Sequence, residues 1–291
     1  MIHASNSPFS STRICGACER ELPEAAYSRE QWVRRQSSRR CEECVASGNQ
    51  LVLMKKGRTR SEGDDCPICQ LPLPLDVKQS VFKPCCMKKL CKGCGLAGRK
   101  RDIIDCPFCR SPEPKTPGQS LAMIRKRVDK GDPVAIWNLG AQYYGGGLKK
   151  DLARAVELFE RAAELGVNDA HFNLGVIYAY DEDVERDVDK AIRHWEAAAI
   201  CGDVSSRFNL GQMECEAGNC DIALQHWMIS VKLGCKNSLS NVKGFFTNGL
   251  ATKSDYAGAL RGYQSAIDEM SSPERDEAKY LEDTARQLGL M

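Results

Sequence analysis

The sequence has 291 residues, of which 42% are hydrophobic and 16 are cysteine. No apolar run approaches the ~18–20 residues that a membrane helix needs, and the polar start at Met1 lacks the apolar segment of a signal peptide. We therefore expect no membrane partner and a reducing intracellular compartment, cytoplasmic or nuclear, where paired cysteines bind metal ions more readily than they form disulfides.

Charge is distributed unevenly along the chain. Residues 1–117 carry 21 Lys and Arg against 13 Asp and Glu, a formal charge of +8, whereas residues 118–291 carry 20 against 26, a charge of −6. A basic half favours nucleic-acid binding. Twelve metal-bound thiolates and three Zn²⁺ ions would add −12 and +6 to the first half and reduce +8 to +2. Nucleic acid is therefore disfavoured as a partner.

The first paired cysteines lie near the N-terminus, after residues 1–13, which we expect to be disordered. Cys15 and Cys18 form a Cys-x-x-Cys pair, which Cys41 and Cys44 repeat. A two-residue gap lets one tight turn present two sulfurs to the same ion, and four thiolates bind Zn²⁺ tetrahedrally. We predict a closed four-cysteine zinc module over residues 14–50, with disulfides as the alternative, and a linker over residues 51–64.

Residues 65–111 hold the densest group of cysteines in the chain. Eight cysteines occur there as four pairs: Cys66 and Cys69, Cys85 and Cys86, Cys91 and Cys94, Cys106 and Cys109. Eight thiolates imply two zinc ions, which makes three for the whole chain. The stretch has too few apolar residues for a useful core, so the metal must supply the folding energy.

This stretch resembles the RING family of ubiquitin ligases. The interleaved order of that family implies that Cys66, Cys69, Cys91 and Cys94 share one zinc and that the other four share the second. Ile68 matches the apolar residue that such domains offer to a ubiquitin-conjugating enzyme, and Pro107 matches a proline of the second contact loop. Arg110 matches the cation that holds the ubiquitin-loaded enzyme in its reactive pose. Such ligases carry no catalytic nucleophile and act by orienting the thioester.

Two features depart from the RING pattern. Cys85 and Cys86 are adjacent, so both can bind one metal only where the backbone bends sharply. Gly98 stands where many ligases have a tryptophan or another bulky contact, and we expect Leu96 to fill that position in part. These departures keep a second interpretation open, a non-catalytic zinc-binding adaptor that does not recruit a conjugating enzyme.

Three prolines mark a linker over residues 112–118, between the zinc half and the rest of the chain. Proline fixes φ and lacks a backbone N–H, so we expect neither a helix nor a central strand there. Such a linker should hold the zinc half at a roughly constant distance from the residues that follow.

Residues 119–291 repeat a signature with a period near 35 residues. An aromatic residue followed by Asn, Leu and Gly occurs at 137–140, 172–175 and 208–211, and a second aromatic marker recurs at Phe159, Trp195, Trp227 and Tyr263. This period indicates stacked helical hairpins that share one elongated core. We predict about four such units, the first with helices over residues 133–144 and 152–164, flanked by helices near residues 120–130 and 273–288.

The repeats resemble the Sel-one-like branch of the tetratricopeptide repeats. The first unit matches that family at Leu139-Gly140, Tyr143, Asp151 and Arg154-Ala155. The resemblance implies a concave face, lined by the first helix of each unit, that binds a protein substrate or peptide. The recurrent Asn138, Asn173 and Asn209 either bind the backbone of an extended peptide there or satisfy neighbouring carbonyl groups.

The predicted fold class is a set of small zinc-stabilised domains, a four-cysteine module and a RING, followed by an all-α helical-repeat solenoid. The indicated function is that of a RING-type ubiquitin ligase, whose zinc domain recruits a ubiquitin-conjugating enzyme and whose repeats bind protein substrates. The alternative is the non-catalytic adaptor. His171, His194 and His226 show no metal-ligand spacing, so we expect them on separate helices as surface or packing residues.

Overall fold

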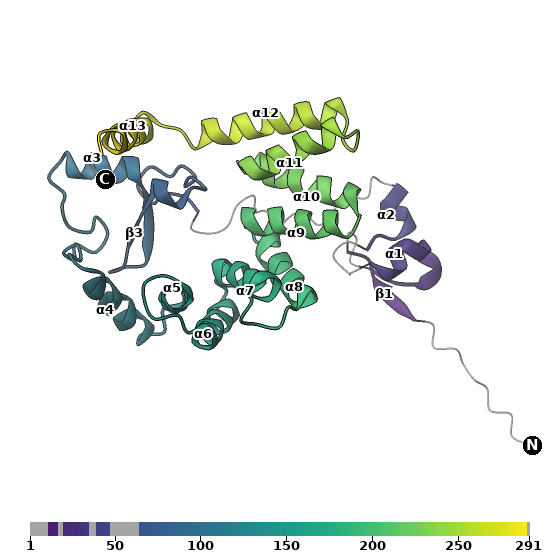
Figure 1. Cartoon of the computed structure of the whole chain (residues 1–291), viewed down its shortest axis with the longest axis horizontal. Coiled ribbons are helices and arrows are strands. Elements are labelled where there is room, and N and C mark those ends of the chain that lie inside the picture. The colour runs from purple at the N-terminus through teal and green to yellow at the C-terminus, as the bar shows by residue number, and fades with distance from the viewer. Residues whose placement is uncertain (1–10, 17–19, 35–38, 47–63, 290–291) are drawn as a thin grey trace, which may run out of the picture.

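The computed structural model describes residues 11–16, 20–34, 39–46 and 64–289 (Figure 1). These residues form an N-terminal cysteine module (residues 11–46), a central cysteine module (residues 64–116) and a solenoid (residues 117–289). The predictions for residues 1–10, for Cys18 and for linker residues 51–63 lie outside the described part of the chain.

The N-terminal cysteine module is built on a short antiparallel ribbon. Strand β1 (Thr12–Ile14) pairs with β2 (Glu21–Pro23), and the 3-10 turn Glu24–Ala26, α1 (Arg29–Val33) and α2 (Glu42–Ala46) follow. Tyr27 is buried, and its hydroxyl donates to the carbonyl of Arg13 at 2.7 Å. The prediction of disorder up to residue 13 is therefore wrong for Thr12 and Arg13, because strand pairing supplies them with partners that the local composition does not reveal.

The central cysteine module is a β-hairpin followed directly by a helix. Strand β3 (Ser80–Lys83), preceded by the 3-10 turn Val77–Gln79, pairs antiparallel with β4 (Lys88–Cys91), and α3 (Lys92–Arg99) continues from β4. The turn between the strands contains Cys85 and Cys86. Met87, at the end of that turn, has a φ of 57°, a left-handed conformation that bends the chain sharply. This bend meets the condition under which two adjacent cysteines can face one site.

Helices α4 to α13 form the solenoid. Their bounds are α4 (Pro117–Val128), α5 (Pro133–Tyr144), α6 (Leu152–Glu164), α7 (Asn168–Tyr180), α8 (Val188–Ile200), α9 (Val204–Glu216), α10 (Cys220–Lys232), α11 (Lys236–Thr247), α12 (Lys253–Glu269) and α13 (Pro273–Gln287). They pair as hairpins α5/α6, α7/α8, α9/α10 and α11/α12, which confirms the predicted helical-repeat solenoid. Asp151 starts α6 by accepting a hydrogen bond from the backbone of Arg154 at 3.0 Å.

The two sequence markers of the repeat meet inside the first three hairpins. A Cβ on Gly175 would lie 2.4 Å from the indole nitrogen of Trp195, and Gly211 bears the same relationship to Trp227. The glycine of the Asn-Leu-Gly signature therefore makes room for the aromatic side chain of the following helix. Both indole rings are buried, so the contact belongs to the core of the solenoid.

The linker predicted over residues 112–118 is shorter than expected. Helix α4 begins at Pro117, where Thr116 caps the helix by accepting from the backbone of Gln119 at 3.2 Å. Proline is tolerated at the first helical position, because the backbone N–H that it lacks would have no partner within the helix. Across the described residues, every helix falls short of the length or the apolar character that a membrane span requires.

The central cysteine module lies between the first and last helices of the solenoid (Figure 1). Helix α13 packs along α3, and α4 contacts the hairpin turn through Arg127. The central cysteine module therefore contacts both ends of the solenoid directly, in addition to its connection through the linker.

Candidate metal centres and apolar groove

The first cluster consists of Cys66, Cys69, Cys91 and Cys94, whose sulfur atoms all lie within 4.8 Å of one another. Two come from the loop before the hairpin, and two come from the junction of β4 and α3. The backbone N–H of Cys91 donates to Cys66 Sγ at 3.4 Å, and that of Cys94 donates to Cys91 Sγ at 3.3 Å. Burial alone would raise the pKa of the Cys66 thiol, but hydrogen bonds from backbone groups lower that pKa to about 7.

The second cluster consists of Cys85, Cys86, Cys106 and Cys109, again with all sulfurs within 4.8 Å of one another. The hairpin turn supplies the first two, and the loop after α3 supplies the others. The Sγ atoms of Cys86 and Cys106 are 3.7 Å apart, and those of Cys85 and Cys109 are 3.3 Å apart. The two clusters thus alternate along the chain, in the grouping that the RING resemblance implies.

The third group, in the N-terminal cysteine module, brings together Cys15, Cys41 and Cys44. The sulfurs of Cys15 and Cys44 are 3.7 Å apart, and the backbone of Cys41 donates to Cys15 Sγ at 3.3 Å. Cys18, the fourth predicted ligand, lies outside the described residues.

These clusters fit a tetrahedral metal ion. A Zn–S bond of about 2.3 Å places tetrahedral thiolates roughly 3.8 Å apart. The separations of 3.9 Å between Cys69 and Cys91 and of 3.7 Å between Cys86 and Cys106 match this spacing. They far exceed the ~2.05 Å of a disulfide bond, and the eight cysteines of the central cysteine module are free thiols. The three cysteine clusters could therefore bind metal ions.

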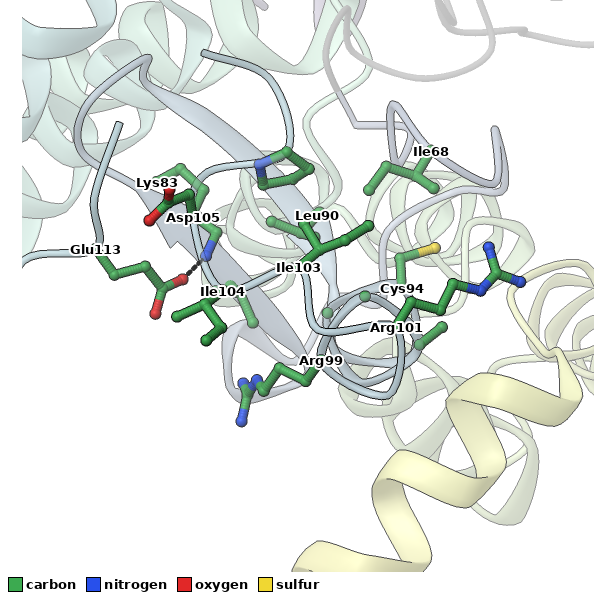
Figure 2. A pocket seen from close by; sticks show the side chains of 15 residues that line it. Ile68, Lys83, Leu90, Cys94, Arg99, Arg101, Ile103, Ile104, Asp105 and Glu113 are labelled. Atoms are coloured by element: carbon green, nitrogen blue, oxygen red, sulfur yellow. Dashed lines mark hydrogen bonds and ion pairs between the residues drawn. The ribbon is translucent and has the colours of Figure 1, made fainter. Parts of the chain in front are cut away.

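An apolar groove lies on the surface of the central cysteine module, beside both clusters. It encloses about 250 Å³, and Ile68 and Pro107 line it. Ile103 and Ile104, from the loop after α3, also line it, and Figure 2 shows them around the same space as Ile68. Both isoleucines are exposed, and the sequence analysis missed them because a short loop has no periodicity that marks a binding face.

Ile103 lies beside the small residue at position 98. A Cβ on Gly98 would be 4.0 Å from the Cβ of Ile103, so the isoleucine occupies the space beside that glycine. The rim of the groove is polar: Lys83 and Glu113 form an ion pair there, and Arg99 is exposed at its edge.

Leu96 does not line the groove, contrary to the prediction that it fills the position of a bulky contact. Gly93 and Lys100, one turn to either side of it on α3, both contact α13, so this face of the helix is turned toward the solenoid. Arg110 is exposed directly after Cys109 and has a φ of 55°.

Two of the three recurrent asparagines bond within the solenoid. Asn138 Nδ2 donates to the carbonyl of Val134 at 2.8 Å, and Asn173 Oδ1 accepts from the indole of Trp137 at 2.7 Å. Of the two alternatives left open for these side chains, the structure favours the satisfaction of neighbouring groups. Asn209 holds the equivalent, half-buried position on α9.

The β3–β4 hairpin covers part of the inner side of the first repeats. Lys89 Nζ lies 3.5 Å from Asp169 Oδ2 and 5.2 Å from the ring centroid of Trp137. A cavity of about 750 Å³, lined by Lys88 and His171 among others, separates this hairpin from α7 and α8. The face predicted to bind a peptide is therefore partly occupied by the chain itself.

The three histidines lie on separate helices, as expected, but His171 and His194 meet. Their Nδ1 atoms are 3.0 Å apart, because α7 and α8 pack as one hairpin. Burial lowers the pKa of His171, and it lowers the pKa of His194 to about 4, assisted by the charges of His171 and Lys190. His226 is buried in α10, with Nδ1 3.4 Å from Arg207, as a packing residue.

Comparison with known proteins bears on the solenoid. The family model named Sel1 repeat matches residues 133–167 and 168–203, so the hairpins α5/α6 and α7/α8 are Sel1 repeats. Among solved structures, the chain is similar to a Sel1 repeat protein from Oxalobacter formigenes, with 26% identity over 53% of this chain and 65% of that one and a TM-score of 0.47. It is also similar to a protective antigen, present in uropathogenic Escherichia coli strains, that displays an SLR fold, with 21% identity over 58% of this chain and 41% of that one and a TM-score of 0.45.

The chain thus spans less than two thirds of the length of either of these two structures. No curated protein matches it. The chain is a helical-repeat protein that contains Sel1 repeats, and it carries three cysteine clusters that could bind metal ions.

Proposed function

We propose that the chain is a RING-type ubiquitin ligase. The central cysteine module recruits a ubiquitin-conjugating enzyme, and the solenoid binds the protein substrate. The observation that carries this proposal is the combination of two alternating four-cysteine clusters with an apolar groove lined by Ile68 and Pro107. The protein works in a reducing compartment, cytoplasmic or nuclear, where its thiols stay available to metal.

Zinc is the metal that we assign to the three clusters. Four thiolates in tetrahedral arrangement suit Zn²⁺, which has no redox chemistry to damage its sulfur ligands. The bound ions supply folding energy to modules whose own buried cores are small. Cys69 and Cys106 flank the loops that carry Ile68 and Pro107, so zinc binding holds both loops in place.

The ligase residues act by orientation. Ile68, Ile103 and Ile104 offer apolar surface on which a loop of the conjugating enzyme docks. Arg110 is exposed beside the second cluster, and its guanidinium offers several hydrogen-bond donors to the ubiquitin-loaded enzyme. Holding the thioester in a near-attack conformation raises the rate without any nucleophile from this chain.

The test is a ubiquitin-discharge assay with the purified full-length protein and a broad panel of conjugating enzymes. We expect stimulated discharge, which Ile68→Ala and Arg110→Ala abolish while each variant keeps three zinc ions by elemental analysis. Ile267→Ala, which removes a partly exposed isoleucine of α12 far along the chain from the groove, is the matched control and should retain activity. Full activity of Ile68→Ala would show that the groove is not the binding site of the conjugating enzyme.

The second candidate is a zinc-stabilised adaptor without ligase activity. Its supporting observation is that α3 presents only small side chains such as Ala97 and Gly98 to the apolar part of the groove, with Arg99 at the polar rim, where a bulky apolar side chain on the helix would strengthen enzyme docking. Titration of the zinc-loaded protein with the same panel separates the two proposals. If no conjugating enzyme binds, the adaptor is the better account, and capture of partners on the solenoid becomes the next experiment.

A further inference from the structure

The last helix of the solenoid reaches into the first cluster through one arginine. Arg275, at the start of α13, is 7% exposed. Its Nη1 donates to the carbonyls of Pro72 and Met270, both at 2.6 Å. Its Nη2 donates to the carbonyl of Leu71 at 3.2 Å and lies 3.4 Å from Cys69 Sγ. A single guanidinium therefore joins α13 to the loop that contains Cys69 and follows Ile68.

Two ion pairs also hold α13 against α3. Lys92 Nζ lies 2.6 Å from Glu282, whose side chain is mostly buried, and Lys100 Nζ lies 2.6 Å from Glu277. The helix that carries Cys94 is thus held to the solenoid on the face opposite the groove.

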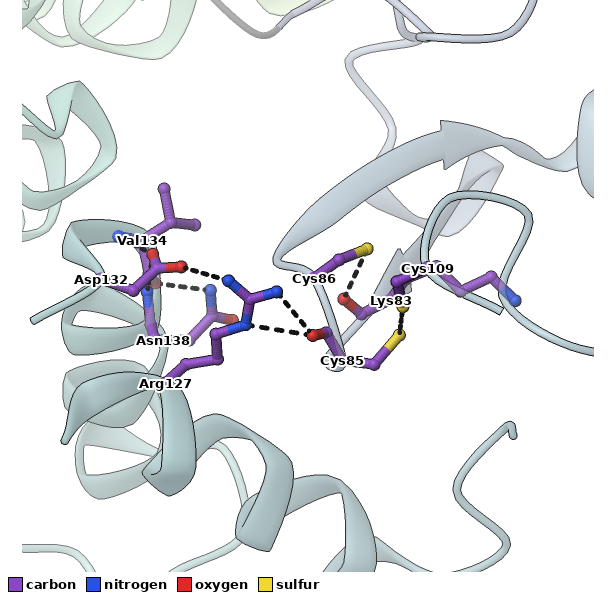
Figure 3. A network of polar contacts seen from close by, with 9 residues as sticks. Lys83, Cys85, Cys86, Cys109, Arg127, Asp132, Val134 and Asn138 are labelled. Atoms are coloured by element: carbon purple, nitrogen blue, oxygen red, sulfur yellow. Dashed lines mark hydrogen bonds and ion pairs between the residues drawn. The ribbon is translucent and has the colours of Figure 1, made fainter. Parts of the chain in front are cut away.

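A second arginine makes the corresponding contact at the other end of the solenoid. The Nε and Nη2 atoms of Arg127, on α4, donate to the carbonyl of Cys85 at 3.1 and 3.0 Å (Figure 3). Its Nη1 lies 3.4 Å from Asp132, which caps α5 by accepting from the backbone of Val134 at 3.1 Å. The hairpin turn of the second cluster is therefore tied to the junction of α4 and α5.

We propose that Arg275 and Arg127 are positioning residues, one for each cluster of the central cysteine module. Arg275 places a donor on the Cys69 thiolate and fixes the carbonyls after it, and Arg127 fixes the backbone of Cys85. Partners outside the ligand set orient the ligands, and their loss typically weakens metal binding about 10–100-fold. The two ends of the solenoid therefore help to orient the cysteines of the metal sites.

This arrangement also couples the solenoid to the groove. The loop that Arg275 holds carries Ile68, so a partner that shifts α13 also shifts the apolar surface of the groove. Regulation of the groove by the solenoid rests on the proposed ligase function, whereas the positioning of the clusters does not.

The experiment measures how fast each cysteine of the zinc-loaded full-length protein reacts with N-ethylmaleimide, resolved by peptide mass spectrometry, after addition of a chelator. In Arg275→Ala, we expect the first-cluster cysteines to react at least tenfold faster and the second-cluster cysteines to react within twofold of wild type. In Arg127→Ala, we expect the reverse pattern. Arg161→Ala is the matched control, because Arg161 is an exposed arginine of α6 and belongs to neither α4 nor α13; it should change neither set.

Each outcome decides the proposal. Equal acceleration of both clusters in each variant would indicate general destabilisation and overturn it, as would wild-type rates. If Arg275→Ala does not fold by circular dichroism, Arg275→Lys decides, since it keeps the charge but loses most of the carbonyl contacts; it should still accelerate the first cluster selectively. If labelling is selective but wild type discharges no ubiquitin, the positioning roles stand and the ligase proposal is rejected. If wild type discharges ubiquitin but labelling is not selective, the ligase proposal stands and the positioning roles are rejected.

Discussion

Gly93 and Arg275 lie so close together that a Cβ on Gly93 would come within 2.7 Å of the backbone nitrogen of Arg275. Gly93 belongs to the central cysteine module and Arg275 to the last helix of the solenoid. The absence of a side chain at position 93 is what allows α3 and α13 to meet, and it makes this junction sensitive to a single methyl group.

Gly93→Ala should therefore destabilise the protein. The added methyl group meets backbone atoms of α13, which cannot rotate away, and we expect a loss of about 1–3 kcal/mol in the free energy of unfolding. Urea denaturation of the zinc-loaded protein measures it. Gly95→Ala is the matched control on the same helix, because its Cβ would lie 3.7 Å from Val81, an ordinary contact. That variant should be neutral or more stable by up to about 1 kcal/mol through helix propensity.

Gly175→Ala should destabilise the solenoid by a similar amount, about 1–3 kcal/mol, because the methyl group would overlap the buried indole of Trp195. Gly244 of α11 has no atom within 4 Å of its added Cβ. Gly244→Ala should therefore match or exceed wild type in thermal unfolding. Equal melting temperatures for the two variants would show that the glycine–aromatic contact does not control hairpin packing.

Stability should fall as the pH drops, because of the His171–His194 pair. The pKa of His194 is about 4 in the folded chain, below the ~6.5 of an unfolded histidine, so the unfolded state binds more protons between these values. Stability is fully present above about pH 7 and is lost progressively toward pH 4. Because the ring is only half buried, we expect a loss of about 1–2 kcal/mol between pH 7.5 and pH 5.

Urea unfolding at both pH values tests this expectation, with His194→Gln as the comparison. The glutamine cannot titrate, so the difference between the two proteins isolates this histidine from metal loss at the cysteine clusters. An identical pH dependence in both proteins would show that the pair contributes nothing.

Removal of metal should affect the cysteine modules more than the solenoid. The solenoid has its own buried core around Phe159, Leu174 and Trp195, whereas the modules bury few apolar residues besides their cysteines. A strong chelator should leave most of the helical circular dichroism signal but increase amide hydrogen exchange in residues 64–111. Loss of most helicity on chelation would mean that the solenoid depends on the metal sites for its fold.

Ile103→Ala should weaken the binding of a conjugating enzyme about tenfold, because it removes apolar surface beside Gly98 that no residue of α3 replaces. Isothermal titration with an enzyme that binds wild type measures this change. Val77→Ala removes a more exposed apolar side chain of the same module, outside the groove, and should leave the affinity unchanged. Equal affinities for Ile103→Ala and wild type would place the contact elsewhere.

The parts of the protein that sequence reasoning could predict depend on contacts close along the chain. The period near 35 residues indicated helical hairpins, and the first hairpin has the expected helix bounds because Asp151 caps α6 within one turn. The spacing of the cysteines likewise indicated pairs that share a site, since a two-residue gap places two sulfurs on one turn, whereas the combination of two alternating pairs at each site followed from the resemblance to the RING family. Metal binding itself, the identity of the metal and the ligase activity stay predictions.

The features that the sequence did not reveal join residues that are distant along the chain. Cys69 and Arg275 are separated by 206 positions, and no periodicity or spacing relates them. His171 and His194 likewise meet only because two helices pack together. Ile103 lies close to Gly98 along the chain, but the direction of the loop between them decides that the isoleucine lines the groove. The repeats and the paired cysteines can be read from the sequence because they depend on local geometry. The contact between the ends of the solenoid and the cysteine clusters cannot be predicted from local geometry. It depends on the summed curvature of all the repeats, which brings both ends of the solenoid to the central cysteine module.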